Sequence, residues 1–173
     1  MKETKLRNVI FPIWFLWFFP PILLIALLGN FIIDSIVIVA SFIALKVSAI
    51  TGFTIKELYK KTIVKVWGFG FLADIIGTIP LLIGFAFGLR PFQVPSEVEV
   101  AVMMNPLSNF WAFLIVFSCM VLASIFIYLF NYHITYKAIV EDKIVRAKLA
   151  LILAVVTTPW TFLIPSEWFY SGF

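Results

Sequence analysis

FWAFLIVFSCMVLASIFIYLFNY, residues 110–132, contains no charged side chain. A single helix needs about 20 consecutive apolar residues to cross the hydrocarbon core of a bilayer. A helix that packs one face against a soluble core carries charged and polar residues on its other face, and this segment lacks them. The segment therefore predicts a membrane-spanning helix and decides the fold class.

The rest of the chain has the same character. Of its 173 residues, 63% are hydrophobic and 13% are charged, whereas a soluble domain is nearer a quarter charged. A soluble fold of this size has too little interior to hide so much apolar surface. We therefore predict an all-α integral membrane protein whose single transmembrane domain covers residues 1–173.

Apolar runs separated by turn-forming residues predict a bundle of about five transmembrane helices. These spans are 9–28, 31–50, 66–89, 110–132 and 149–164. Gly29 and Asn30 are expected to form a turn between the first two spans, with Asn30 capping the second helix. Pro20 and Pro21 should kink or break the helix of the first span. The fifth span is the shortest and contains Pro159.

The connections between these spans also carry structural signals. Residues 54–65 form a basic amphipathic segment, and Thr54 with Glu57 fits a capping box at its start. Residues 90–109 form the longest loop, in which a short surface helix is favoured over a strand. Asp142 is expected to cap the last helix.

Basic residues are distributed unevenly about the predicted spans. One set of flanks carries Lys2, Lys5, Arg7, Lys56, Lys60, Lys61, Lys65, Lys137, Lys143, Arg146 and Lys148. The opposite flanks carry only Arg90, beside three glutamates. Because Lys and Arg accumulate on the cytoplasmic side, this pattern predicts a cytoplasmic N-terminus, an extracytoplasmic loop 90–109 and an extracytoplasmic C-terminus. The expected location is the cell (plasma) membrane, and the Phe-, Ile- and Lys-rich composition suggests a bacterium.

Asp74 is the most informative ionisable residue inside a predicted span, because a charge within the membrane is costly. At helical spacing, a stripe of small residues shares its face: Gly70, Gly77, Gly84 and Gly88. Such glycines let another helix approach closely, so we predict a helix-packing face here. Asp74 should face protein or a polar cavity, either as a cation, proton or substrate site or as a buried structural carboxylate.

Two other charged residues fall within predicted spans. Lys46 is a candidate partner for Asp74, although extension of its ammonium group to the inner interface is favoured over pairing. Asp34 lies in the first turn of the predicted second helix, where a carboxylate complements the helix dipole. Since Asp34 is then expected on the other side of the bilayer midplane from Asp74, the sequence predicts no aspartyl dyad.

The fourth span carries a polar stripe. Ser124, Tyr128, Asn131 and Thr135 fall on one helical face. They either line a groove open to the cytoplasm or form hydrogen bonds between helices, and the second interpretation is slightly preferred. His133 is expected at the membrane interface.

No catalytic, nucleotide-binding or metal-binding motif is recognisable, so no cofactor is expected and an enzymatic activity is not favoured. Two hypotheses remain. The first is a transport or permeation protein, or a membrane subunit of a transporter, with a polar site near Asp74. The second is a non-catalytic membrane partner, such as an assembly or immunity-type protein. The expected partners are the lipid bilayer and a second copy or another membrane protein, and not nucleic acid.

Overall fold

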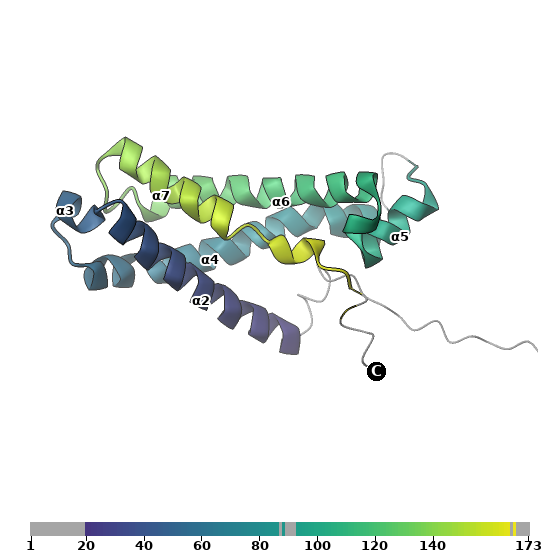
Figure 1. Ribbon diagram of the computed structural model, residues 1–173, viewed down its shortest axis with the longest axis horizontal. Coiled ribbons are helices and arrows are strands. Elements are labelled where there is room, and N and C mark those ends of the chain that lie inside the picture. The colour runs from purple at the N-terminus through teal and green to yellow at the C-terminus, as the bar shows by residue number, and fades with distance from the viewer. Residues whose placement is uncertain (1–19, 87, 89–92, 167, 169–173) are drawn as a thin grey trace, which may run out of the picture.

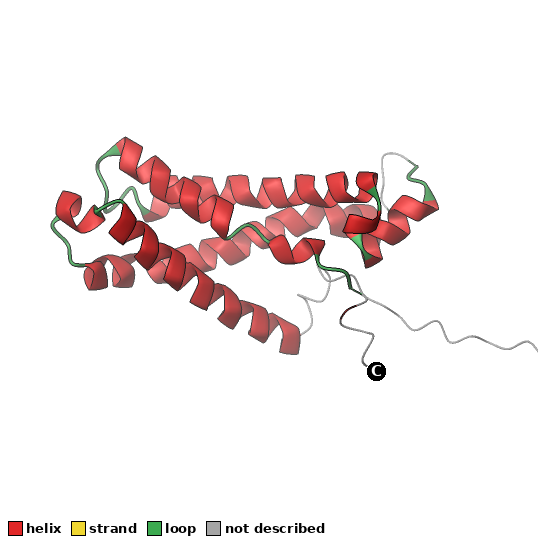
Figure 2. Ribbon diagram, viewed as in Figure 1, coloured by secondary structure: helices red, strands yellow, loops and turns green. Residues whose placement is uncertain are grey.

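The computed structural model describes residues 20–86, 88, 93–166 and 168. Regular structure in these residues is entirely helical, with no strand in the described ranges (Figure 2). The predicted all-α class is therefore confirmed.

The helices follow one another along the chain with short connections (Figure 1). The α-helices are α2 (Pro20–Ala44), α3 (Val47–Thr51), α4 (Ile55–Leu81), α5 (Ser96–Met104), α6 (Phe110–Phe130) and α7 (Lys143–Val156). Two π-helical turns, η1 (Leu82–Ala86) and η3 (Asn131–Thr135), extend α4 and α6. Two 3₁₀ turns, η2 (Pro106–Ser108) and η4 (Trp160–Leu163), precede α6 and follow α7.

Four helical segments in the described part are long and apolar enough to cross a membrane. They are Leu23–Ala44, Ile55–Phe85, Phe110–Thr135 and Lys143–Leu163. This arrangement is compatible with a multi-pass membrane protein. The predicted count of five is not confirmed, and residues 9–19 of the predicted first span lie outside the described residues.

The predicted turn at Gly29 and Asn30 is wrong, because α2 runs through both residues. One glycine inside a helix costs only about 1 kcal/mol relative to alanine, which a long apolar helix tolerates. Pro20 and Pro21 lie in the first turn of α2, where a missing N–H costs little. The residues before Pro20, on which the predicted kink or break also depends, lie outside the described part of the chain.

The start of α4 confirms the predicted capping box. The Thr54 side chain accepts a hydrogen bond from the Glu57 backbone N–H, and the Glu57 carboxylate accepts from the Thr54 N–H at 2.8 Å. These bonds satisfy two backbone donors that the first helical turn leaves free. Residues 55–65 are consequently continuous with the span predicted over 66–89, and the two form one helix.

The last helix also begins as predicted, because the Asp142 carboxylate accepts from the Ile144 and Val145 N–H groups at 2.7 and 3.2 Å. The α-helical part of α7 ends at Val156, before Pro159, rather than at residue 164. The predicted helix in loop 90–109 is present as α5, with Pro95 at its N-cap.

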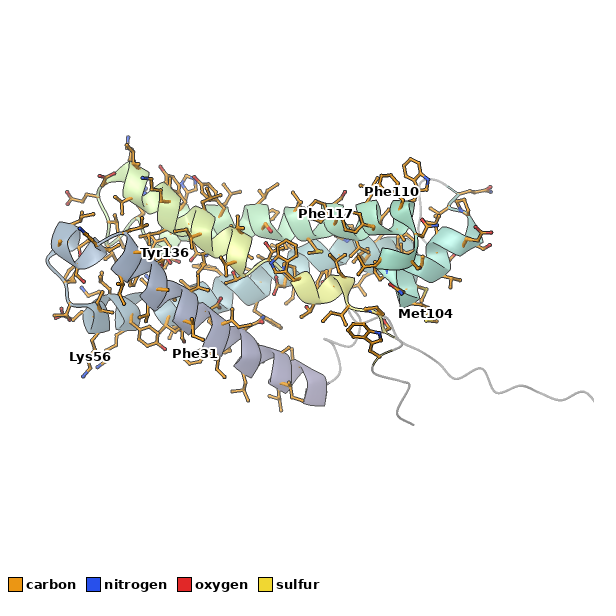
Figure 3. The ribbon with its side chains drawn as sticks, viewed as in Figure 1. Phe31, Lys56, Met104, Phe110, Phe117 and Tyr136 are labelled. Carbon is orange, nitrogen blue, oxygen red and sulfur yellow. The ribbon has the colours of Figure 1, made fainter. Side chains whose placement is uncertain are left out.

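The four long helices form one bundle. Helix α4 contacts α6 and α2, and α7 contacts α6 and α2 (Figure 1). One apolar core, near the end that carries α3, includes Phe42, Leu58, Tyr136 and Leu149. A second core, beside α5, includes Leu81, Val102, Met120 and Phe162. Figure 3 shows Lys56 at the α3 end and Met104 and Phe110 at the opposite end.

Candidate functional site

Two aspartates from neighbouring long helices line one cavity of about 120 Å³. Asp34 comes from α2 and Asp74 from α4, and each side chain is buried, at 4% and 3% exposure. The wall is completed by Asn30, Ile33, Gly70, Val156, Thr157, Thr158, Pro159, Trp160 and Thr161. Three of the four long helical segments therefore meet at this cavity.

Asp74 is held in the middle of α4, and its own helix leaves its carboxylate free. The Thr78 hydroxyl donates to the Asp74 backbone carbonyl at 2.8 Å, not to its side chain. The Asp74 Oδ1 atom is fully buried and has no hydrogen-bond partner among the described residues. Since buried polar groups are almost always paired, a buried carboxyl group without a hydrogen-bond partner, on a residue that lines a cavity, points to a site for another polar species.

Gly70 lies directly beside the Asp34 carboxyl group at this cavity. A Cβ atom on Gly70 would lie 3.7 Å from the Asp34 Oδ2 atom. Gly70 and Asp74 are one helical turn apart on α4, so their side-chain positions are about 5–6 Å from each other. The two carboxyl groups are thus brought within reach of one small ligand.

Trp67 fixes α2 against α4 next to this opening. Its indole Nε1 donates to the Leu27 carbonyl at 2.9 Å. Its ring also makes an edge contact with Phe31, with centroids 6.0 Å apart. Both contacts lie within two turns of Asp34 along α2 and one turn from Gly70, so they set the position of α2 at the cavity.

The third wall is the C-terminal end of α7. The Thr157 hydroxyl donates to the Leu153 carbonyl at 2.8 Å, and the Thr158 hydroxyl donates to the Ala154 carbonyl at 2.6 Å. The Leu153 carbonyl also accepts from the Thr157 backbone N–H at 2.9 Å, so these bonds close the last turn of α7 just before Pro159. The negative end of the α7 dipole therefore lies at the cavity, where it favours positive charge.

The cavity is electrostatically one-sided. Its described lining contains two acidic side chains and no Lys, Arg or His. A buried pair of carboxylates without a cationic partner is unfavourable in a low-dielectric interior. The arrangement is chemically suited to a cation or to protons, and it repels anions.

Ser124 is the member of the predicted polar stripe that approaches this site. Its hydroxyl oxygen lies 2.8 Å from that of Thr158, a cavity residue. Ser124 thereby links α6 to the end of α7. Tyr128 and Asn131 do not line the cavity: Tyr128 stacks on Tyr132, with ring centroids 5.6 Å apart.

Asn131 and its neighbours form a separate buried polar layer at the π-helical turn η3. The Asn131 amide donates to the Ile127 carbonyl at 2.8 Å. The Asn131 Oδ1, Thr135 Oγ1 and Tyr136 OH atoms are buried and have no hydrogen-bond partner among the described residues. Burial, and to a lesser extent the Asp34 carboxyl group, raises the pKa of the Tyr136 phenol.

Lys46 is not part of the site. It is exposed in the turn after α2, with a left-handed backbone (φ 52°), and it does not line the cavity. The prediction that Lys46 lies within a span is wrong, because α2 ends at Ala44. The structure therefore does not bring Lys46 to Asp74.

The predicted glycine face divides into different environments. A Cβ on Gly77 would lie 2.8 Å from both the Ala123 Cβ and the Cys119 carbonyl oxygen, so Gly77 is a close contact between α4 and α6. Gly70 instead borders the cavity. Gly84 is half-buried in η1, and Gly88 is exposed with nothing near its Cβ position, which corrects the prediction for Gly88.

The sequence interpretation missed Asp34 as a site residue. The predicted turn at Gly29 and Asn30 placed Asp34 at a helix start, whereas it lies in the middle of α2 beside the Asp74 cavity. This corrects both the dipole role and the expectation that the two aspartates lie apart. Asn30, Thr157 and Thr158 were also missed, although Thr-Thr-Pro inside an apolar run signals a helix break with polar groups at membrane depth.

Other reactive side chains lie apart from this cavity. Among the described residues, no cluster of three or more His, Cys, Asp or Glu side chains is placed to hold a metal ion. Cys119 is buried in the apolar core beside α5, and the His133 ring packs edge-on against Tyr132 with centroids 4.8 Å apart. No protein-family model, curated protein or solved structure matches the chain.

Proposed function

We propose that the protein carries a small polar or positively charged solute across a cell membrane, with the Asp34–Asp74 cavity as its binding site. The single observation that supports this is that two buried aspartates from different helices, Asp34 and Asp74, line one cavity. Ionisable residues inside membrane proteins are retained at a cost and commonly mark a substrate or ion path. A site between helices, next to a proline-broken segment, is also typical of transporters.

The proposed orientation places the α3 end of the bundle in the cytoplasm. The turn after α3 and the connection between α6 and α7 share a surface depression that includes Phe53, Lys137 and Glu141. The basic side chains of both regions therefore gather at one end: Lys56, Lys60, Lys61, Lys65, Lys137, Lys143 and Lys148. By the positive-inside rule this end faces the cytoplasm.

In this orientation Pro20 and the η4 turn lie on the extracytoplasmic side, which agrees with the predicted side for the C-terminal region. The predicted cytoplasmic N-terminus falls on residues 1–19, outside the described part of the chain. Reporter fusions after Thr51, Asn105 and Val140 test the proposal. Cytoplasmic signals after Thr51 and Val140, with an extracytoplasmic signal after Asn105, are expected; the reverse pattern would contradict it.

Flux measurements test the transport proposal directly. Purified protein in liposomes is assayed with entrapped indicators for H⁺, Na⁺, K⁺ and Mg²⁺. At least one flux above that of protein-free liposomes is expected, and Asp74→Asn or Asp34→Asn should remove it. Glu97→Gln, which neutralises an exposed carboxylate on α5, is the matched control and should retain the flux. Equal flux in wild type and both aspartate variants would exclude the cavity from the path.

A second candidate function is binding to another membrane protein or to a second copy of the chain. It is favoured by the N-terminal half of α2, where Leu24, Ile25 and Leu28 are 61%, 72% and 66% exposed. In Figure 1 this half of α2 diverges from the rest of the bundle. Disulfide crosslinking of an Ile25→Cys variant in native membranes should give one discrete product; monomer alone would count against this function.

A further inference from the structure

We propose that the ligand of the Asp34–Asp74 cavity is a small divalent cation that keeps part of its water shell, with Mg²⁺ as the probe. This inference rests on the proposed function, since it names the class of solute for the same site. Three properties of the cavity favour such an ion: its donor atoms, its charge and its size.

The donor atoms of the cavity are oxygens. Carboxylates come from Asp34 and Asp74, hydroxyls from Thr157 and Thr158, and an amide from Asn30. No described His or Cys lines the cavity. Oxygen donors suit hard cations such as Mg²⁺ and Ca²⁺, whereas Zn²⁺ and Cu²⁺ prefer imidazole or thiolate.

The threonines offer lone pairs rather than protons. The hydroxyl proton of Thr157 is used in the bond to the Leu153 carbonyl, and that of Thr158 in the bond to the Ala154 carbonyl. The Thr157 oxygen therefore keeps acceptor capacity on its other side, whereas the Thr158 oxygen shares its remaining capacity with the Ser124 hydroxyl 2.8 Å away. Oxygen lone pairs at the negative end of the α7 dipole favour a cation and disfavour an anion.

Charge balance favours a divalent over a monovalent ion. When a cation displaces the carboxyl protons, Asp34 and Asp74 give the cavity two negative charges, and no described cationic side chain lines it. One divalent ion neutralises both, whereas one monovalent ion leaves a net buried charge in a low-dielectric environment. Asp34 and Asp74 both line the cavity, and the Oδ1 atom of Asp74 has no hydrogen-bond partner among the described residues that would compete with an ion for this carboxyl group.

The size of the cavity fits a partly hydrated ion. Its volume of about 120 Å³ accommodates roughly four waters at about 30 Å³ each. Mg²⁺ gives up its waters reluctantly and is usually held through one or two carboxylates with several waters retained. The missing side chain at Gly70, whose Cβ position is 3.7 Å from the Asp34 Oδ2 atom, keeps this volume open.

The experiment measures equilibrium binding, without a gradient. Full-length protein in lipid nanodiscs is titrated with MgCl₂, and with NaCl at matched ionic strength, by calorimetry and by thermal unfolding. Wild type and Glu97→Gln should bind Mg²⁺ with a rise in Tm that NaCl does not produce. Asp34→Asn and Asp74→Asn should each weaken Mg²⁺ binding by about tenfold or more.

A variant that reduces the volume of the cavity tests Mg²⁺ binding even if an aspartate variant fails to fold. Gly70→Val retains both carboxylates but fills the space beside Asp34, and it should also weaken Mg²⁺ binding. Absence of Mg²⁺ binding to wild type, or equal binding in all variants, overturns the inference.

Different results would contradict the transport function and the divalent-cation inference. Mg²⁺ binding without flux of any solute overturns the transport function alone. Flux of another solute that is lost in Asp74→Asn, with no Mg²⁺ binding, overturns the divalent-cation inference alone.

Discussion

Gly70 and Gly77 lie two turns apart on nearly the same face of α4, yet they serve opposite purposes. At Gly77 the absent side chain lets α6 approach, so that no room remains for even one carbon atom. At Gly70 the absent side chain leaves room beside the Asp34 carboxylate and preserves a polar cavity. The difference arises because α4 contacts α6 at one position and faces α2 at the other.

This comparison shows that a small-residue stripe has no single meaning in a membrane helix. Glycine permits close packing where a neighbouring backbone is in reach, which is a main source of stability between helices in lipid. Where the neighbour presents a carboxylate instead, the same residue maintains a site. Gly77 therefore contributes to stability and Gly70 to the cavity, although both lie on one face of α4. Substitutions at the two positions should distinguish these roles.

The largest effect is expected for Gly77→Ala. Its new Cβ would lie 2.8 Å from the Ala123 Cβ and from the Cys119 carbonyl oxygen, so α4 and α6 must separate. We expect the free energy of unfolding to fall by about 1–3 kcal/mol. Equilibrium unfolding in mixed micelles measures this change.

Gly68→Ala is the control for that experiment, because nothing lies within 4 Å of the Cβ position of Gly68. It should leave stability unchanged or raise it by up to about 1 kcal/mol, since alanine favours a helix over glycine. Equal stabilities of the two variants would show that the α4–α6 contact is not as tight at Gly77 as described.

The next largest effect on stability is expected at the cavity, where a substitution should stabilise the protein rather than destabilise it. Asp74→Leu removes a buried oxygen that has no partner and places apolar atoms in the cavity. We expect stability to rise by about 1–2 kcal/mol, because an unsatisfied buried polar group is costly. The same variant should lose the proposed flux.

Asp142→Ala is the matched control among the aspartates. Its carboxylate accepts two backbone hydrogen bonds at the start of α7, so its loss should lower stability by about 1 kcal/mol. A fall in stability for Asp74→Leu similar to that of Asp142→Ala would mean that Asp74 has a structural partner.

Apolar length and local capping rules were enough to predict the helical class, the spans at α4 and α6 and the caps at Thr54 and Asp142. These signals depend on residues close in sequence, so they can be identified without tertiary information. The turn at Gly29 and Asn30 failed for the same reason. A Gly-Asn pair is a good local turn signal, but the length of the surrounding apolar run and the contacts of α2 with α4 and α7 decide otherwise.

The candidate site was only half predictable. Asp74 was identified because a carboxylate in an apolar run is unusual, and this signal does not depend on how the helix packs. Its apposition to Asp34 depends on how α2 crosses α4 at Gly70, which is a three-dimensional property without a sequence period. Likewise, the glycine stripe predicted close packing, but it did not distinguish Gly70 from Gly77, because the neighbour at each position comes from a different helix.

A smaller effect is expected for Gly70→Ala, which sharpens the contrast with Gly77→Ala. The added carbon would lie at an ordinary contact distance, 3.7 Å, from the Asp34 Oδ2 atom. Stability should stay within about 1 kcal/mol of wild type, because the gain in helix propensity offsets mild crowding. Mg²⁺ affinity should nevertheless fall. A stability loss as large as that of Gly77→Ala would show that Gly70 is also a packing glycine.

The smallest effect is expected at the junction of the two regions, for Ser124→Ala. Ser124 lies on α6 one residue after Ala123, which contacts Gly77, and its hydroxyl meets that of Thr158 at the cavity. Hydrogen bonds between membrane helices average about 0.6 kcal/mol, so a loss of that order is expected.

Ser118→Ala provides the comparison for this last variant, because the exposed Ser118 hydroxyl donates only to the Leu114 carbonyl of its own helix, at 2.7 Å. It should leave unfolding unchanged within error. If Ser124→Ala also alters Mg²⁺ binding while Ser118→Ala does not, the Thr158 wall of the cavity depends on α6. Changes at Gly77 would then reach the site through Ala123 and Ser124. If neither serine affects binding, packing at Gly77 and the cavity at Gly70 are independent along α4.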